Sequence, residues 1–422
     1  MEIEKRSRHK EIGRVGQFRS GGRFFEEFLK ELRGRRGIEV YTEMAENDDI
    51  IGALLFAIEK LIGSVEWGVV PASDKGIDRE CAEFVESCMH DMSSTWVDTI
   101  SEILSMLVYG WSAHEIVYKR RCGRSRNPYL NSVYNDGLIG WQKLPIRAQT
   151  TLYEWLYEDG TDNLIGMRQQ PPPDYEMIDI PIERLLLFRT TKKKDNPEGR
   201  SILRNAYRSW YFKKRIQEIE GIGVERDLAG FPVLYAPEQT DIWDENDIDM
   251  VNQRRIATDM IKNVRRDKQE GILLPFGWKF ELVTSGGARQ FDTSKIIERY
   301  DGRMAMTVLA DFILLGHQST GTYSLSSDKS QMFTVAIGSW LDVIRETFED
   351  KAIPLLVDIN SEHFKGISGY PRLSHGEVEN RNLGELAEYI KALSGAGIIF
   401  DDEQANYLFR AAKMPEHKET EL

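Results

Sequence analysis

Cysteine is scarce in this chain, with Cys81, Cys88 and Cys122 the only three among 422 residues. A small, odd number of cysteines excludes a disulfide framework and is typical of a protein that folds in a reducing cytoplasm. Cys81 and Cys88 fall on the apolar side of a helical pattern over residues 78–92, which predicts buried, reduced thiols.

Long hydrophobic runs are also lacking. No apolar run reaches the roughly 18 residues that a membrane-spanning helix needs. The N-terminal stretch MEIEKRSRHKEIGR is charged and has no apolar core, so it is not a secretory signal. We therefore expect no membrane as a partner.

Enzyme signatures are few and incomplete. His114–Glu115 resembles the start of a zinc-protease helix, but Tyr118 stands where the second histidine would be, and the segment reads as a strand. Gly221 and Gly223 match only half of a dinucleotide-binding motif and fall inside a predicted helix. There is no Walker A pattern, and the seven histidines have no metal-ligand spacing. The sequence predicts no catalytic residue, no metal and no cofactor, and so no enzyme.

One acidic cluster leaves an alternative open. It consists of Asp241, Asp244, Glu245, Asp247 and Asp249, and it lacks the glycine and glutamate of an EF-hand loop. The acids are typical of the solvated start of a helix. A nuclease that holds Mg²⁺ with Asp244, Asp247 and Asp249 would also use such a cluster.

The net charge of −13 is unevenly distributed. Residues 1–36 carry eleven Lys and Arg against six Glu, a balance of +5, which leaves −18 on the rest of the chain. Such acidity argues against a conventional nucleic-acid-binding protein with a basic surface. It does not exclude a protein through which DNA passes without being held.

Hydrophobic patterns and the positions of glycine and proline divide the chain into segments. Residues 1–37 form a basic, Gly-rich stretch that predicts a mobile or partner-ordered arm. Residues 38–200 alternate helical and strand patterns, and two long helices are predicted at 201–230 and 289–315 on either side of a small α/β insert at 231–288. Helices of about 25 residues would be about 36 Å long. The polar stretch QSTGTYSLSSDKS, at 318–330, then predicts a loop before a helix at 331–370, which places Phe333, Ile337, Trp340, Leu341, Ile344 and Phe348 on one face and bends or ends near Pro354.

Several pieces of this sequence, in order, resemble tailed-bacteriophage portal proteins, especially the phage Mu-like portal family. The central piece, NPEGRSILRNAYRSWYFKKRIQEIEGIGVERDLAGFPVLYAP, contains a P-x-G-x-S-x-L-R motif from Pro197 to Arg204, followed by a charged helix. The pieces YTEMAENDDIIGALLFAIEKLIGSVEWGVVPA, LVYGWSAHEIVY and EGILLPFGWKFELV also resemble the family, as does the helix–loop–helix around residues 318–330. The resemblance covers residues 38–370.

The resemblance implies an α+β portal-protein fold. Its parts would be a mixed α/β wing (38–200 and 331–370), a two-helix stem (201–230 and 289–315), a small α/β clip (231–288), a tunnel loop (316–330) and a helical C-terminal crown with a tail (371–422). It also implies a homo-oligomeric ring, usually of twelve subunits, at one capsid vertex of the virion, assembled in the host cytoplasm. Double-stranded DNA would pass through the ring without sequence specificity. The further partners would be the terminase large subunit, the head–tail connector or adaptor, and the major capsid and scaffolding proteins.

Three sets of residues are candidates for function. The tunnel loop facing the DNA channel would use Gln318, Ser319, Thr320, Gly321, Thr322, Tyr323, Ser324, Ser326, Ser327 and Lys329. On the stem, Lys213, Lys214 and Arg215 would contact DNA or the capsid, or would pair with Glu218, Glu220 or Glu225 of neighbouring helices. The clip would dock its partners through Asp244, Asp247, Arg254, Arg255, Arg265 and Arg266.

Electrostatics is compatible with a DNA conduit. Nonspecific DNA binding comes from Lys and Arg that neutralise phosphates, and a ring multiplies each such charge by its copy number. A basic channel would therefore trap its cargo, whereas an acidic chain with few channel cations such as Lys329 would let it slide. Besides the nuclease, a minor capsid or adaptor component without stem and clip remains an alternative.

Overall fold

The structure is a computed structural model, and it describes residues 14–229, 231–238, 240–263, 273–283, 292–307 and 323–378. The chain divides into two compact units. Unit 1 contains the described residues up to Asn205 and from Ala305 onward, and unit 2 is Ala206–Met304. The mixture of helices and strands confirms the expected α+β class.

Helices form the larger core of unit 1. They are α1 Gly34–Asn47, α2 Asp49–Gly63, α3 Gly76–His90, α4 Trp96–Ile103, α5 Ser105–Tyr109, α9 Tyr323–Thr347 and α10 Ile353–Ile359. The predicted apolar face of α9 is confirmed, because Phe333, Ile337, Leu341 and Ile344 are buried and Trp340 packs against the same core. Cys81 and Cys88 are buried free thiols in this core, as expected.

The ends of these helices follow their sequence signals. The Asp48 carboxylate accepts hydrogen bonds from the backbone N–H groups of Ile50 and Ile51 at the start of α2. Gly110, with φ of 93°, ends α5 in the left-handed conformation that glycine adopts readily. Near Pro354, where the helix was expected to bend or end, a π-helical turn at Phe348–Ala352 interrupts the α-helix, and α10 continues the chain with Pro354 in its first turn.

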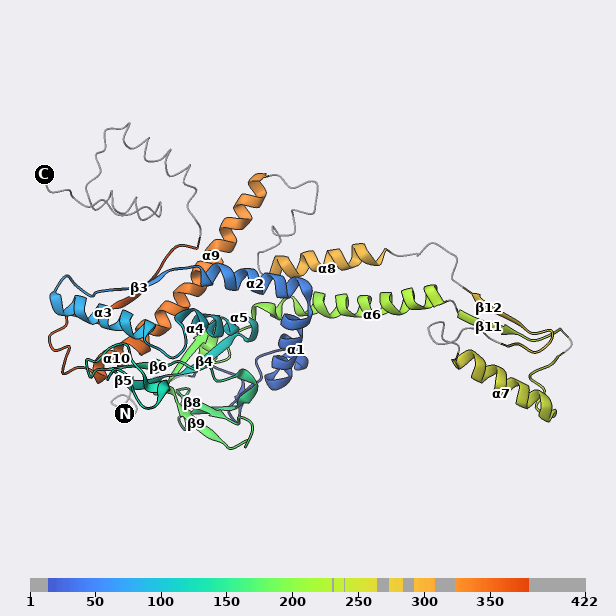
Figure 1. The fold of residues 1–422 in the computed structure, drawn as a ribbon, viewed down its shortest axis with the longest axis horizontal. Coiled ribbons are helices and arrows are strands. Elements are labelled where there is room, and N and C mark those ends of the chain that lie inside the picture. The colour runs from blue at the N-terminus through green and yellow to red at the C-terminus, as the bar shows by residue number, and fades with distance from the viewer. Residues whose placement is uncertain are drawn as a thin grey trace, which may run out of the picture. The chain divides into compact units, whose positions relative to one another are not determined.

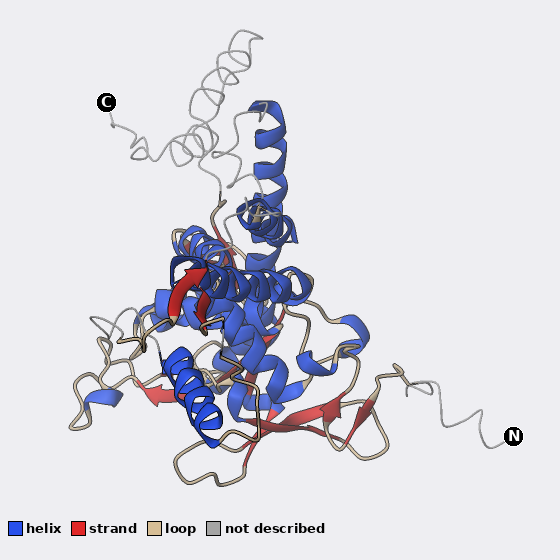
Figure 2. Ribbon diagram, turned by 90° about the vertical axis from the view of Figure 1, so that its right-hand side faces the viewer, coloured by secondary structure: helices blue, strands red, loops and turns tan. Residues whose placement is uncertain are grey.

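The strands of unit 1 pair antiparallel in short ribbons, which Figure 2 shows in red. The pairs are β1 Arg19–Ser20 with β2 Arg23–Phe24, β3 Trp67–Val70 with β13 Arg372–His375, β4 Trp111–Glu115 with β10 Leu185–Arg189, and β5 Val117–Arg120 with β6 Ile139–Lys143. β7 Leu152–Tyr157, β8 Leu164–Gln169 and β9 Ile178–Pro181 form a three-stranded sheet. Short 3-10 turns lie at Lys30–Leu32, Pro128–Leu130, Gln149–Thr151, Ile182–Arg184, Lys193–Asp195 and Ile202–Arg204.

Residues 14–37, predicted as part of a mobile or partner-ordered arm, pack against the rest of unit 1. Phe24 is buried in a second core with Trp111 and Trp155, and Leu32 is also buried. The Arg19 guanidinium pairs with Asp162 at 2.7 Å. These few anchors outweigh the Gly-rich, basic composition on which the prediction was based. Residues 1–13 lie outside the described part of the chain.

Unit 2 consists of two long helices and a small α/β piece. The helices are α6 Tyr207–Ala229 and α8 Thr293–Thr307, and the α/β piece contains β11 Phe231–Tyr235, α7 Ile248–Asn263 and β12 Lys279–Val283. Figure 1 shows α6 and α8 running alongside each other. Gly277, with φ of 82°, forms a turn before β12. β12 pairs with β11, and Leu273–Pro275 is not a strand. Among the helices that the structure describes, none could cross a bilayer.

Candidate DNA channel and docking surfaces

Two of the motifs that carry the family resemblance meet in space. Gly110, from the LVYGWS piece, lies against Gly199 of the P-x-G-x-S motif so closely that a Cβ on Gly199 would lie 2.2 Å from the Gly110 carbonyl oxygen. The Ser201 hydroxyl accepts a hydrogen bond from the Leu203 N–H at 3.0 Å, and Arg204 binds Glu27 through two nitrogens at 2.6 and 2.7 Å. The motif therefore positions the chain just before α6, the first helix predicted for the stem, and the close backbone approach of Gly110 and Gly199 requires glycine at both positions.

A buried ion pair joins the two stem helices. The Lys213 Nζ of α6 lies 2.7 Å from Asp301 Oδ1 of α8, and Lys213 is only 1% exposed. The rings of Phe212 and Tyr300 stack beside it, with centroids 6.3 Å apart, and Thr293 hydrogen-bonds to Glu220 farther along. These contacts define an antiparallel helix pair.

Within the single chain, Lys213 is buried against Asp301 of the same chain, whereas a contact with DNA, the capsid or a glutamate of a neighbouring helix was expected. Lys214 lies over the Trp210 ring at 5.4 Å, and the exposed Arg215 donates to the Tyr211 hydroxyl at 3.3 Å. For Lys214 and Arg215, a contact with DNA or the capsid stays a prediction.

Part of the predicted tunnel loop is helical. Residues Gln318, Ser319, Thr320, Gly321 and Thr322 lie outside the described part of the chain. The backbone of Tyr323–Ser330 is helical and forms the first turns of α9, so Tyr323, Ser324, Ser326, Ser327 and Lys329 belong to a helix. The last glycine before α9 is Gly321. Serine is only moderately unfavourable in a helix, and Leu325 and Lys329 favour one.

The clip residues fall on a small, ordered surface of unit 2. The Asp247 carboxylate accepts a hydrogen bond from the Asp249 N–H at 2.9 Å at the start of α7, and Asp244 accepts one from the Asn246 N–H at 2.9 Å. Arg254 lies 5.5 Å from the Trp243 ring and Arg255 is exposed. Arg265 and Arg266 lie outside the described residues.

The nuclease alternative finds no support in this geometry. The carboxylates of Asp244 and Asp247 serve the backbone of their own segment. Over the ranges that the structure describes, no three His, Cys, Asp or Glu side chains are grouped to hold a metal ion. His114 lies in β4, where its ring contacts Ser112 Oγ at 2.7 Å and the Leu144 carbonyl at 2.9 Å, and burial lowers its pKa to about 4. The prediction that His114 is an ordinary strand residue is confirmed.

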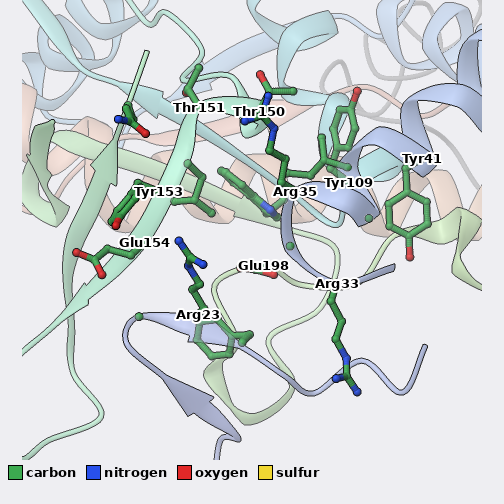
Figure 3. Close-up of a pocket in the computed structure, with 18 of the residues that line it drawn as sticks. Arg23, Arg33, Arg35, Tyr41, Tyr109, Thr150, Thr151, Tyr153, Glu154 and Glu198 are labelled. Carbon is green, nitrogen blue, oxygen red and sulfur yellow. The ribbon is translucent and has the colours of Figure 1, made fainter. Parts of the chain in front are cut away.

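Sequence reasoning missed a cavity of about 660 Å³ in unit 1. The N-terminal arm forms one wall, with Arg23 and Arg33, and β7 contributes Tyr153 and Glu154 (Figure 3). Because the arm was expected to be mobile, the sequence offered no signal for a cavity beneath it. Glu198, from the P-x-G-x-S motif, lines this cavity and accepts a hydrogen bond from the Trp155 indole at 3.2 Å.

Glu198→Gln is expected to stabilise the chain at pH 8 and to have little effect at pH 4. Burial raises the pKa of the Glu198 carboxyl from 4.5 to about 7, so the folded state binds the proton more tightly than the unfolded state does. Stability is therefore lost as the pH rises from about 4.5 to about 7. Since the side chain borders a cavity, we expect Glu198→Gln to raise the free energy of unfolding by about 2 kcal/mol at pH 8. Denaturant unfolding of both forms across this range measures it, and an equal effect at both pH values would contradict the assignment.

Comparison with known proteins identifies the family. Residues 38–410 match the family described as the portal protein of Mu bacteriophage, and the chain belongs to that family. Its function is that of a portal protein at a capsid vertex.

Three solved structures are similar at low identity. One is a chain of the virion of a native gene transfer agent particle, at 10% identity and a TM-score of 0.48, covering 92% of this chain and 95% of that one. A chain from the neck of the empty gene transfer agent particle gives 11% identity and a TM-score of 0.49, covering 90% and 94%. An HK97 family phage portal protein from Corynebacterium diphtheriae gives 10% identity and a TM-score of 0.40, and the match covers 81% of this chain and 95% of that one.

Proposed function

We propose that copies of this chain form a closed ring, of twelve subunits, around a channel for double-stranded DNA. Packaging brings the genome in through this channel and ejection lets it out, and no catalytic step by this chain is needed. The antiparallel pair of α6 and α8 supports this proposal most strongly, because a helix pair locked by a buried ion pair suits the wall of a channel. The family to which the chain belongs supports it independently.

The surface of the stem helix also favours an assembly. On α6, Tyr211, Phe212, Ile219 and Ile222 are all exposed in the single chain. Exposed apolar side chains along one helix are typical of a surface that a partner covers. In a ring, the stem of a neighbouring copy would cover them.

The remaining parts take roles by their position in the chain. Residues 316–322 and the first turns of α9 would face the channel, where sparse cations let DNA slide. The α/β piece of unit 2 would be the clip, docking the terminase large subunit during packaging and the head–tail connector afterwards. Unit 1 would be the wing, in contact with the major capsid and scaffolding proteins.

Electron microscopy of the purified chain tests the ring. We expect negative-stain class averages with a central hole and roughly twelve subunits of 48.6 kDa each. A monomer at every concentration in light scattering would contradict the proposal.

Deleting Gly321–Ser326 is the second arm of this experiment. It removes the start of α9 together with the preceding residues. We expect rings of normal size and heads with less retained DNA, because the deletion touches the channel and leaves the stem pair intact. Ser326→Ala is the control. Normal DNA content in the deletion variant would exclude the role given to the tunnel loop.

A further inference from the structure

A loop between β5 and β6 exposes apolar side chains on unit 1. We call residues 120–136 the basic loop. Tyr129 is 70% exposed and Val133 is 87% exposed, and Leu130 and Tyr134 are also exposed. Large apolar side chains gathered at one place on a surface are typical of an interaction site.

The basic loop is held firmly, so its exposure does not come from a lack of structure. The buried Asp91 carboxylate accepts hydrogen bonds from the Ser132 hydroxyl at 2.7 Å and the Val133 N–H at 2.8 Å. Lys119 lies 3.1 Å from the same carboxylate and donates to the Asn131 carbonyl. The protein therefore fixes these apolar side chains in an outward position.

A second exposed apolar surface lies on the connection between β8 and β9. We call residues 171–179 the acidic turn. Tyr175 is 61% exposed, and Met177 and Ile178 are also exposed. Tyr175 has a φ of 55°, which is uncommon for a residue other than glycine. Its backbone is held by an N–H bond to the Pro171 carbonyl at 3.0 Å and by the Gln170 amide, which donates to the Tyr175 carbonyl at 3.2 Å.

The two surfaces carry opposite, unused charges. In the basic loop, Arg120, Arg124 and Arg126 are exposed and form no ion pair with any described residue. In the acidic turn, Asp174 and Glu176 are exposed and likewise unpaired within the described ranges, whereas Asp179 is bound by Arg168. Three free cations beside apolar side chains therefore match two free carboxylates beside apolar side chains.

We infer that the basic loop of one copy seats on the acidic turn of the next copy. The inference rests on the proposed ring and names a contact that would hold it. A ring closes through two different, complementary surfaces on every subunit. This chain, whose net charge is −13, presents a cationic and an anionic surface of that kind on the same unit. Complementary charge sets register and partner choice across such contacts.

Charge reversal tests the pairing. In Arg124→Glu/Arg126→Glu both surfaces become anionic, and in Asp174→Lys/Glu176→Lys both become cationic. We expect each variant alone to need at least about tenfold more protein for half-assembly, measured by light scattering at low ionic strength, because like charges then face each other. An equal mixture of the two is expected to assemble almost as well as the wild type, since opposite surfaces meet again when the variants alternate around an even-numbered ring.

The control carries the same change of charge elsewhere. Lys365→Glu/Arg372→Glu reverses two exposed cations of unit 1 that form no ion pair with any residue in the described ranges, and it should assemble like the wild type. The pairing would be overturned if the reversal variants assembled as the control does, or if the mixture assembled no better than its components. Either result would leave the proposed ring unaffected. A wild-type chain that stays monomeric would overturn the ring and the pairing together.

Discussion

Lys213→Met is expected to weaken the pairing of α6 with α8 by about 3–5 kcal/mol, because it removes the buried cation that lies against the Asp301 carboxylate. The lysine is 1% exposed, and its Nζ lies 2.7 Å from Asp301 Oδ1. A buried charge that loses its partner retains the cost of its desolvation. Methionine keeps most of the volume of the lysine side chain, so the loss reports on charge more than on packing.

Hydrogen exchange of the backbone amides measures this effect in the intact chain. We expect faster exchange in α6 and α8, with α2 and α3 of unit 1 unchanged. Arg215→Met, two residues away on an exposed position of α6, should change the free energy of opening obtained from exchange by less than about 1 kcal/mol. The double variant Lys213→Met/Asp301→Asn should recover part of the loss, because no full charge is then left unpaired. Equal effects of Lys213→Met and Arg215→Met would show that the ion pair contributes nothing.

Local patterns predicted the elements that depend on local forces. The apolar stripe of α9 follows from residues spaced three or four apart in the sequence, and it is confirmed. The two glycines that meet at Gly110 and Gly199 belong to pieces that were correctly associated with the family. Their contact could not be predicted. When two distant segments approach closely, the only sign of it in the sequence is one glycine in each segment, and nothing pairs the two.

Long-range pairing accounts for the failures. Lys213 sits in a run of three cations, and nothing in that run distinguishes the buried one from its neighbours until Asp301 is placed opposite. Residues 14–37 look like a flexible arm by composition, yet Phe24 and Leu32 are enough to attach them. The cavity beneath the arm was missed for the same reason. The start of α9 was missed because serine is typical of loops but is also tolerated in a helix.

Asp91→Ala is expected to destabilise unit 1 by about 3–5 kcal/mol, since it leaves Lys119 buried without its carboxylate. The side chains of Asp91 and Lys119 are 3% and 2% exposed, and their charged atoms lie 3.1 Å apart. The substitution also removes the acceptor for Ser132 and Val133. Thermal unfolding and the exchange rates of the basic loop measure the two parts of this effect.

Asp136→Ala is the comparison variant, because it also removes the carboxylate partner of a buried cation, here Arg121. Arg121 keeps hydrogen bonds to Ser87 and Cys88, and the Asp136 side chain is 34% exposed, so we expect a smaller loss of stability than for Asp91→Ala. An assembly assay distinguishes a loss of stability in unit 1 from a loss of the outward position of the basic loop. If the basic loop must be held outward to seat on a neighbour, Asp91→Ala should weaken assembly even at temperatures where unit 1 stays folded. Normal assembly with a freely exchanging loop would mean that the ring does not use this surface.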